Sequence, residues 1–161
     1  MLLALGISAV VGYLLGSVNF AVLVAKRHGV DILKEGSGNP GATNVLRTGS
    51  KAAAALTLAG DAAKGWLAVF GARHLFPDNA DAAIAVAAVA VTLGHMYSAF
   101  LRLKGGNGVA TAVGVLLAAS SIMENGIEVS SFWRALLTAL VASAVTVVLD
   151  VIFGSNDDDT Y

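Results

Sequence analysis

The chain has 161 residues, of which 57% are hydrophobic and only 13% are charged, and its mean hydropathy is +0.76. The charged share is about half of the roughly 25% that soluble domains carry, and the apolar residues form long blocks, so a soluble Ala-rich helical protein is the weaker interpretation. The chain contains no cysteine, which excludes a disulfide framework and a thiolate metal site. The net charge of −1 says little about partners.

The apolar blocks predict an all-α, polytopic membrane helix bundle of about five spans, forming one transmembrane domain over residues 1–153. A stretch of about 20 apolar residues can cross a hydrocarbon core of about 30 Å. The expected spans are 1–25, 52–76, 82–101, 109–122 and 132–153. The fourth is short enough to be either a short span or a re-entrant segment. The acidic tail, 154–161, is expected to be disordered.

Two glycine-rich basic loops, 26–51 and 102–108, separate these blocks. They hold seven of the ten basic residues: Lys26, Arg27, Lys34, Arg47, Lys51, Arg102 and Lys104. Five spans with the N-terminus outside place both loops on one side, which the positive-inside rule makes the cytoplasmic side. The turns at 77–81 and 123–131 would then lie outside.

The first loop contains a G-x-G-x-x-G pattern at Gly36, Gly38 and Gly41, and Asp61 follows at the distance of a ribose-binding acid. A dinucleotide site would need a preceding strand inside a βαβ unit, whereas this loop follows an apolar helix. The sequence therefore excludes a Rossmann site. No Walker motif occurs, and His28, His74 and His95 are too scattered to predict a metal site.

Both loops are nevertheless suited to binding an anion. Glycines permit positive φ angles and let successive backbone N–H groups form an anion-binding nest. Each loop leads into an expected helix N-terminus, which also favours anions. Either loop alone could be an ordinary connector, but the two together predict a phosphate-binding site. The first loop adds neutral donors and the forked cation of Arg47, and the second repeats this composition with two basic residues, three glycines and Thr111.

Three polar residues lie near these loops within apolar segments. Asp61 and Lys64 are three residues apart, so they share a helix face and could pair. A structural ion pair and a role in binding substrate remain equally open. His95 is either a packed residue or a functional one, and its closeness to the second basic loop favours a hydrogen-bonding or proton-transfer role.

The stretch GSGNPGATNVLR, residues 36–47, resembles the first motif of the acyl-phosphate:glycerol-3-phosphate acyltransferase family. GHMYSAFLRLKGGNGVATAVGVLL, residues 94–117, resembles its second loop. The resemblance implies a multi-pass enzyme of phospholipid synthesis in the bacterial inner membrane, with its active site facing the cytoplasm. Such enzymes transfer a fatty acyl group from acyl phosphate to the 1-hydroxyl of glycerol 3-phosphate, releasing lysophosphatidic acid and phosphate. It implies no acyl-enzyme intermediate, no metal, no cofactor and no nucleic-acid partner.

The resemblance also implies site residues. Ser37 and Arg47 would be an essential pair, and we add His95 as a catalytic candidate. The candidates for holding substrate and phosphate are Gly36, Gly38, Asn39, Thr43, Asn44, Lys104, Gly105, Gly106, Asn107 and Gly108.

The chain departs from the family in three places. The family's second loop reads K-G-G-K-G, whereas here Asn107 replaces the second lysine and so should weaken phosphate binding. Ser98 stands where a proline is usual. No match to a third motif bearing His, Glu and Asn is found after Ala119, so we expect the resemblance to end near residue 120 and the C-terminal quarter to be divergent or truncated.

Two further interpretations stay open, and the departures motivate the first of them. One is a catalytically weak family member that binds phosphate compounds. The other is a small anion transporter in which the paired loops act as gates and the polar residues Asp61, Lys64 and His95 line a path.

Overall fold

The computed structural model describes residues 1–122, which consist of helices and turns with no strand among them. This confirms the all-helical class. The expected span 132–153, the link 123–131 and the tail lie outside the described residues. The elements are α1 (Leu2–Ser17), α2 (Phe20–Arg27), α3 (Ala42–Thr48), α4 (Lys51–Leu75), η1 (Pro77–Asn79), α5 (Ala80–Met96), η2 (Ala99–Leu101) and α6 (Val109–Ile122).

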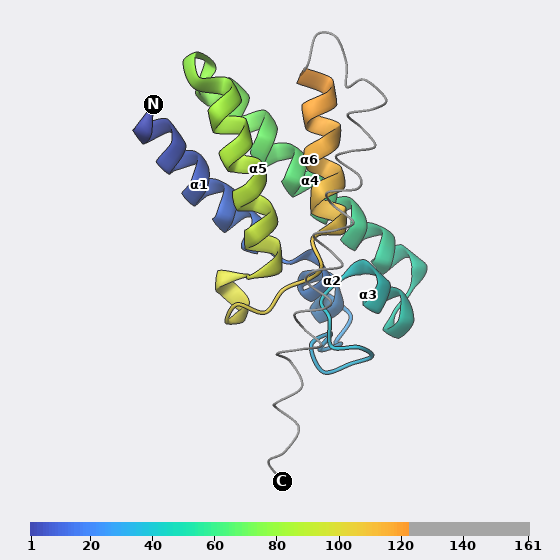
Figure 1. Cartoon of the computed structure of the whole chain (residues 1–161). Coiled ribbons are helices and arrows are strands. Elements are labelled where there is room, and N and C mark those ends of the chain that lie inside the picture. Colours follow the sequence, from blue (N-terminus) through green and yellow to red (C-terminus); the bar gives the residue numbers. More distant parts are fainter. Residues whose placement is uncertain (123–161) are drawn as a thin grey trace.

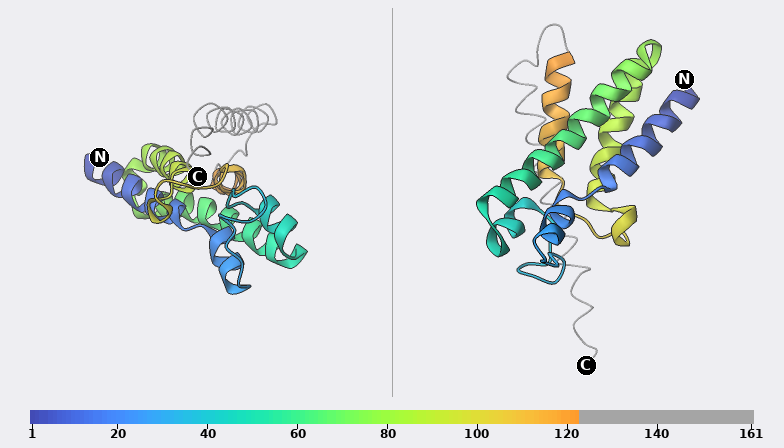
Figure 2. Two further views of the ribbon diagram at one scale, coloured as in Figure 1. Left: turned by 90° about the horizontal axis from the view of Figure 1, so that it is seen from below. Right: turned by 180° about the vertical axis from the view of Figure 1, so that it is seen from behind.

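The four longer helices alternate in direction, so that both glycine loops lie at the same end of the molecule. Figure 1 shows α2, α3 and the two loops gathered at the end opposite the N-terminus. The views from below and behind in Figure 2 show the same arrangement. The convergence of the two loops, which the sequence analysis required for a shared site, is therefore present.

The first apolar block is two helices, so the single continuous helix expected over 1–25 is wrong. The chain breaks at Asn19, whose backbone is extended and whose side chain accepts a hydrogen bond from Val22 N at 3.0 Å. Asparagine is favoured at such a cap because its side chain satisfies a free helix N–H group. Asn19 Nδ2 also donates to Pro40 O at 3.1 Å, which ties the break to the first glycine loop.

The first glycine loop contains a helix, α3, where an irregular segment was expected. Val45 on α3 is only 2% exposed and anchors this helix in an apolar cluster. The other buried members of the cluster are Ala21, Ala25, Ile32, Ala53 and Ala54. The cluster joins α2, α3 and the start of α4, and therefore holds the loop in place.

The third block ends earlier than expected, because α5 stops at Met96 and the chain turns before η2. Ser98 Oγ donates to Ser17 O at 2.6 Å, and Ala99 N donates to Ser17 Oγ at 3.2 Å. Ser98, one of the departures from the family pattern, thus fixes this turn to the end of α1. The fourth block matches α6 at both ends.

The long helices pack most closely in two pairs, α1 with α5 and α4 with α6, at glycines where the backbones touch, and α4 also packs against α5. A Cβ atom at Gly16 or Gly94 would collide with a carbonyl of the partner helix in the first pair, as it would at Gly65 or Gly114 in the second. Small residues at such crossings are typical of membrane helices, because without a hydrophobic driving force close packing must supply the attraction.

Within residues 1–122, two helical stretches are long and apolar enough to cross a bilayer: Leu2–Arg27, which joins α1 and α2, and Pro77–Leu101. The helix α4 is long but is not among them, and it carries Asp61 and Lys64. Many large apolar side chains remain exposed on the helices, including Val10, Val11, Leu14, Leu58, Leu67, Val89, Leu93, Val113 and Leu117. A surface of this kind fits contact with lipid.

Candidate functional site

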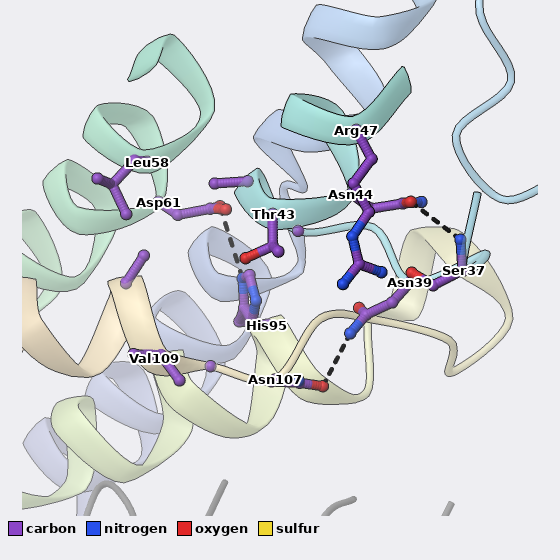
Figure 3. Close-up of a pocket in the computed structure, with 14 residues that line it drawn as sticks. Ser37, Asn39, Thr43, Asn44, Arg47, Leu58, Asp61, His95, Asn107 and Val109 are labelled. Carbon is purple, nitrogen blue, oxygen red and sulfur yellow. Dashed lines mark hydrogen bonds and ion pairs between the residues drawn. The ribbon is translucent and has the colours of Figure 1, made fainter. Parts of the chain in front are cut away.

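A cavity of about 380 Å³ lies where the two glycine loops meet α3, α4, α5 and α6. Figure 3 shows side chains from both loops and from the helices converging on it. It is lined by Ser37, Asn39, Gly41, Ala42, Thr43, Asn44, Arg47, Leu58, Asp61, His95, Asn107, Gly108, Val109 and Ala110.

Most of the site residues predicted from the sequence line this cavity. They are Ser37, Asn39, Thr43, Asn44, Arg47, His95, Asn107 and Gly108. The other candidates lie outside the lining: Gly36, Gly38, Lys104, Gly105 and Gly106. Asp61 lines the cavity although the prediction left its role open; its place within an apolar helix was the signal that pointed to it.

Arg47 supplies the cavity with a positive charge. It lies in the last turn of α3, and Figure 3 shows its guanidinium directed toward Asn39 and Asn107. Among residues 1–122 the guanidinium forms no ion pair. A guanidinium in this position can bind the oxygens of a phosphate or carboxylate bidentately.

Asn44 organises the first loop rather than facing the cavity with a free amide. Its side chain is buried, its Oδ1 accepts from Ser37 N at 3.0 Å, and its Nδ2 donates to Ile32 O at 3.2 Å and to Glu35 O at 2.8 Å. Gly36 lies against this amide with φ +63°, and a Cβ atom there would collide with Asn44 Oδ1. Gly36 and Asn44 therefore shape the loop that carries Ser37.

A hydrogen bond between side chains joins the two loops across the cavity. Asn39 Nδ2 donates to Asn107 Oδ1 at 3.0 Å, as Figure 3 shows. Asn39 Oδ1 is buried and has no hydrogen-bond partner within the described part of the chain. Because buried polar atoms are nearly always satisfied, this acceptor is available to a ligand hydroxyl or a water molecule.

A buried polar cluster of Asp61, Lys64 and His95 forms one wall of the site. Lys64 Nζ lies 2.9 Å from Asp61 Oδ1 and 2.8 Å from His95 Nδ1, and it donates to Val18 O at 2.7 Å. The predicted pairing of Asp61 with Lys64 is confirmed, and His95 is hydrogen-bonded as well as packed. Asp61 and His95 line the cavity, whereas Lys64 lies behind them.

Gly105 and Gly106 of the second loop pack directly against His95. Gly106 N donates to His95 O at 3.1 Å, and a Cβ atom at Gly106 would collide with His95 Nε2. A Cβ atom at Gly105 would collide with His95 O. These two positions require glycine because the loop backbone passes directly over the histidine. Their expected role as phosphate ligands stays a prediction.

The N-terminal turn of α6 also opens on the cavity, through Gly108, Val109 and Ala110. Helix N-termini carry a partial positive charge and unpaired N–H groups, which favour anions. This arrangement is that of a helical protein whose exposed apolar faces fit contact with lipid, with a cavity at one end of its helices whose lining suits an anion.

The sequence profile of the glycerol-3-phosphate acyltransferase family matches residues 6–154, and the chain belongs to this family. The expected family is thereby confirmed. The match extends well beyond residue 120, so the expectation that the resemblance ends there is wrong.

Individual relatives bear the same name. The glycerol-3-phosphate acyltransferase of Paraburkholderia xenovorans is 61% identical over 123 residues, which cover 73% of this chain and 56% of that protein. That of Bordetella pertussis is 51% identical over 152 residues, covering 91% and 71% respectively. The aligned part of this chain thus spans little more than half of the first relative.

Two solved structures are also similar. Both are of PlsY (YgiH), described as an integral membrane glycerol 3-phosphate acyltransferase. The glycerol 3-phosphate form has a TM-score of 0.68 and 34% identity, covering 92% of this chain and 78% of that one. The lysophosphatidic acid form has a TM-score of 0.69 and 30% identity, covering 93% and 92%.

Proposed function

We propose that this chain transfers a fatty acyl group from acyl phosphate to the 1-hydroxyl of glycerol 3-phosphate, giving lysophosphatidic acid and inorganic phosphate. The observation that carries the proposal is the Arg47 guanidinium, which faces a cavity formed by both family motifs. The family match and the names of the relatives support the substrate, as do the solved PlsY forms with glycerol 3-phosphate and lysophosphatidic acid.

The reaction requires no nucleophile from the protein, because acyl phosphate is already an activated acyl donor. The substrate hydroxyl oxygen attacks the acyl carbonyl carbon, the bond from that carbon to the phosphate oxygen breaks, and the hydroxyl proton passes to a phosphate oxygen. The protein then has to hold two anionic substrates with the hydroxyl close to the acyl carbonyl carbon, and to stabilise the charge that develops during the reaction. Arg47 and the N-terminus of α6 would hold the anions, and Asn39 Oδ1, which has no hydrogen-bond partner within residues 1–122, would accept from a hydroxyl.

The proposal includes a topology. The chain would form one transmembrane domain over 1–153, with five spans, the N-terminus outside and the cavity on the cytoplasmic side of the bacterial inner membrane. The position of both basic loops at one end of the helices supports this orientation. The membrane would hold the acyl chain, since each buried CH₂ group contributes about 0.8 kcal/mol. A water-soluble substrate could enter and a lipid product could leave sideways.

The direct test is turnover by the purified full chain in detergent micelles. Phosphate release from acyl phosphate should require glycerol 3-phosphate, and lysophosphatidic acid should accumulate in equal amount; glycerol, which lacks the phosphate, is the matched control substrate. Monodisperse protein that releases no phosphate under these conditions would refute the proposal. Flux of glycerol 3-phosphate across proteoliposomes without lipid product would instead favour the transporter.

A catalytically weak enzyme is the second candidate, and Asn107 favours it. Its neutral side chain lines the cavity where the family pattern has a lysine, so Arg47 has less help in neutralising phosphate. This candidate predicts the same products at a lower rate.

A further inference from the structure

Lys64 forms two hydrogen bonds and one ion pair through its ammonium group. Nζ lies 2.7 Å from Val18 O, 2.9 Å from Asp61 Oδ1 and 2.8 Å from His95 Nδ1. An ammonium group has three donors and no acceptor, so in its contacts with Val18 O and with His95 Nδ1 it can only donate. The adjacent Asp61 carboxylate balances its charge. The lysine is only 2% exposed, which leaves water little access to compete.

This arrangement fixes which nitrogen of His95 carries a proton. If Nδ1 accepts from Lys64, a neutral imidazole must hold its proton on Nε2. In the opposite arrangement Nδ1 would donate to Asp61 Oδ1, but those two atoms are 3.5 Å apart, at the limit of a hydrogen bond. The shorter contact to Lys64 therefore decides for the Nε2–H tautomer.

His95 is one of the residues that line the cavity. Gly106 lies beside Nε2, and any side chain at that position would cover it. No residue within 1–122 forms a hydrogen bond to Nε2, although the residue is only 3% exposed. In Figure 3 the ring lies between Asp61 on one side and Asn107 on the other. Within the described part of the chain, Nε2 is thus a donor without a partner.

We infer that Lys64 is a positioning residue, which holds His95 as the Nε2–H tautomer so that it donates a hydrogen bond to an anionic oxygen of the substrate in the cavity. The inference rests on the proposed function for the identity of that oxygen, which belongs to a phosphate group. A bare Nε2 lone pair at the same place would repel the anion. Asp61 then serves to neutralise Lys64, not to take a proton from the substrate.

The first experiment reads the tautomer in the wild-type chain and needs no variant of the cluster. Nitrogen-15 NMR of histidine-labelled protein in micelles should show His95 Nδ1 unprotonated and hydrogen-bonded, and Nε2 protonated. Variants His28→Gln and His74→Gln assign the other two histidine signals. Adding inorganic phosphate should shift the Nε2 proton resonance. A protonated Nδ1 with a bare Nε2 would overturn the inference, whether or not the enzyme turns over.

The second experiment uses variants of Lys64. Lys64→Met removes the three donors and should give a mixture of His95 tautomers, with kcat lowered at least about tenfold. Lys64→Arg keeps donors at this position and should retain part of the wild-type tautomer preference and part of the wild-type kcat. This variant also tests the inference if Lys64→Met does not fold. The matched control is Thr57→Val, a buried polar position one turn before Asp61, which should leave the tautomer and the rate unchanged.

A double variant distinguishes a positioning role of Lys64 from a purely stabilising role. In a His95→Gln background, Lys64→Met should cost little further activity, because its effect acts through the histidine. Wild-type kcat in folded Lys64→Met would refute the inference while leaving the acyltransferase assignment intact. Full additivity of the two substitutions would refute it as well.

Discussion

Arg47 differs from Lys34, another basic residue of the first glycine loop, in where its charged group lies. Its guanidinium lies in the cavity, whereas Lys34 is 83% exposed and pairs with Asp31 at 3.4 Å on the surface. Sequence analysis already favoured Arg47 over Lys34 as an anion-binding residue. The fold of α3 adds that Arg47 lines the cavity, whereas Lys34 is solvated.

We expect Arg47→Ala to lower kcat/KM for glycerol 3-phosphate by about ten- to hundredfold. Hydrogen bonds to charged groups contribute about 1.5–3 kcal/mol, and about 1.4 kcal/mol corresponds to a factor of ten. Steady-state phosphate release measures the effect. Lys34→Ala is the control and should stay within twofold of wild type. Equal effects of the two substitutions would exclude a direct role for Arg47.

Asn107 offers the opposite substitution, a gain of charge. In Asn107→Lys the ammonium group would join Arg47 in the cavity and could donate to Asn39 Oδ1, the buried acceptor that lacks a partner in the described part. A charged donor exceeds a neutral one by about 1 kcal/mol, so KM for glycerol 3-phosphate should fall about fivefold. Asn107→Gln, which keeps a neutral amide, should not lower KM. An unchanged KM in Asn107→Lys would show that charge at this position is irrelevant.

At the residue scale, the sequence predicted which residues lie near the cavity better than it predicted what each of them does there. The motif brought Ser37, Asn39 and Arg47 into one cavity as predicted. It did not reveal that both the oxygen and the nitrogen of the Asn44 amide form hydrogen bonds with backbone groups, because those partners lie seven to twelve residues away in the chain. Hydrogen bonds across a loop depend on its folded path, which local pattern does not specify.

At the scale of elements, apolar length predicted where helices lie but not where they break. The break between α1 and α2 occurs at Asn19, which caps α2 and also contacts Pro40 in the first loop. A cap residue inside an apolar block is a weak local signal. The contact with the loop is what makes the break stable, and it exists only in the folded chain.

The crossing of α4 and α6 gives a test at this scale. Gly114 lies where a Cβ atom would collide with Ala62 O, whereas a Cβ atom at Gly71, also in a helix interior, would have nothing within 4 Å. Gly114→Ala should destabilise the fold by about 1–3 kcal/mol through overpacking. Gly71→Ala should be neutral or stabilise by about 0.5–1 kcal/mol, because alanine loses less backbone entropy.

Thermal unfolding in detergent, followed by loss of the monodisperse peak, compares these two alanine variants directly. A lower midpoint for Gly114→Ala and an equal or higher one for Gly71→Ala is the expected pattern. Equal midpoints would show that the α4–α6 crossing relaxes freely.

At the scale of the whole molecule, the proposed orientation can be read by cysteine labelling, since the chain has no cysteine of its own. Lys34→Cys and Arg102→Cys should react with a membrane-impermeant maleimide only in inside-out vesicles. Asp78→Cys, in the turn between α4 and α5, should react only from the opposite side. Labelling of the two loops from different sides would contradict the shared cytoplasmic site.

The sequence by itself determined that the chain is a helical membrane protein and which family it belongs to, and it predicted that two glycine loops form its site. These properties follow from composition, apolar block length and contiguous motifs, all of which are local. The tertiary structure decided which residues face the cavity, and it placed Lys64 behind His95. Those facts depend on contacts such as Lys64 with His95, 31 residues apart, and Asn39 with Asn107, 68 residues apart. Only the packing of the helices and the folded paths of the two loops bring such distant side chains within hydrogen-bonding distance.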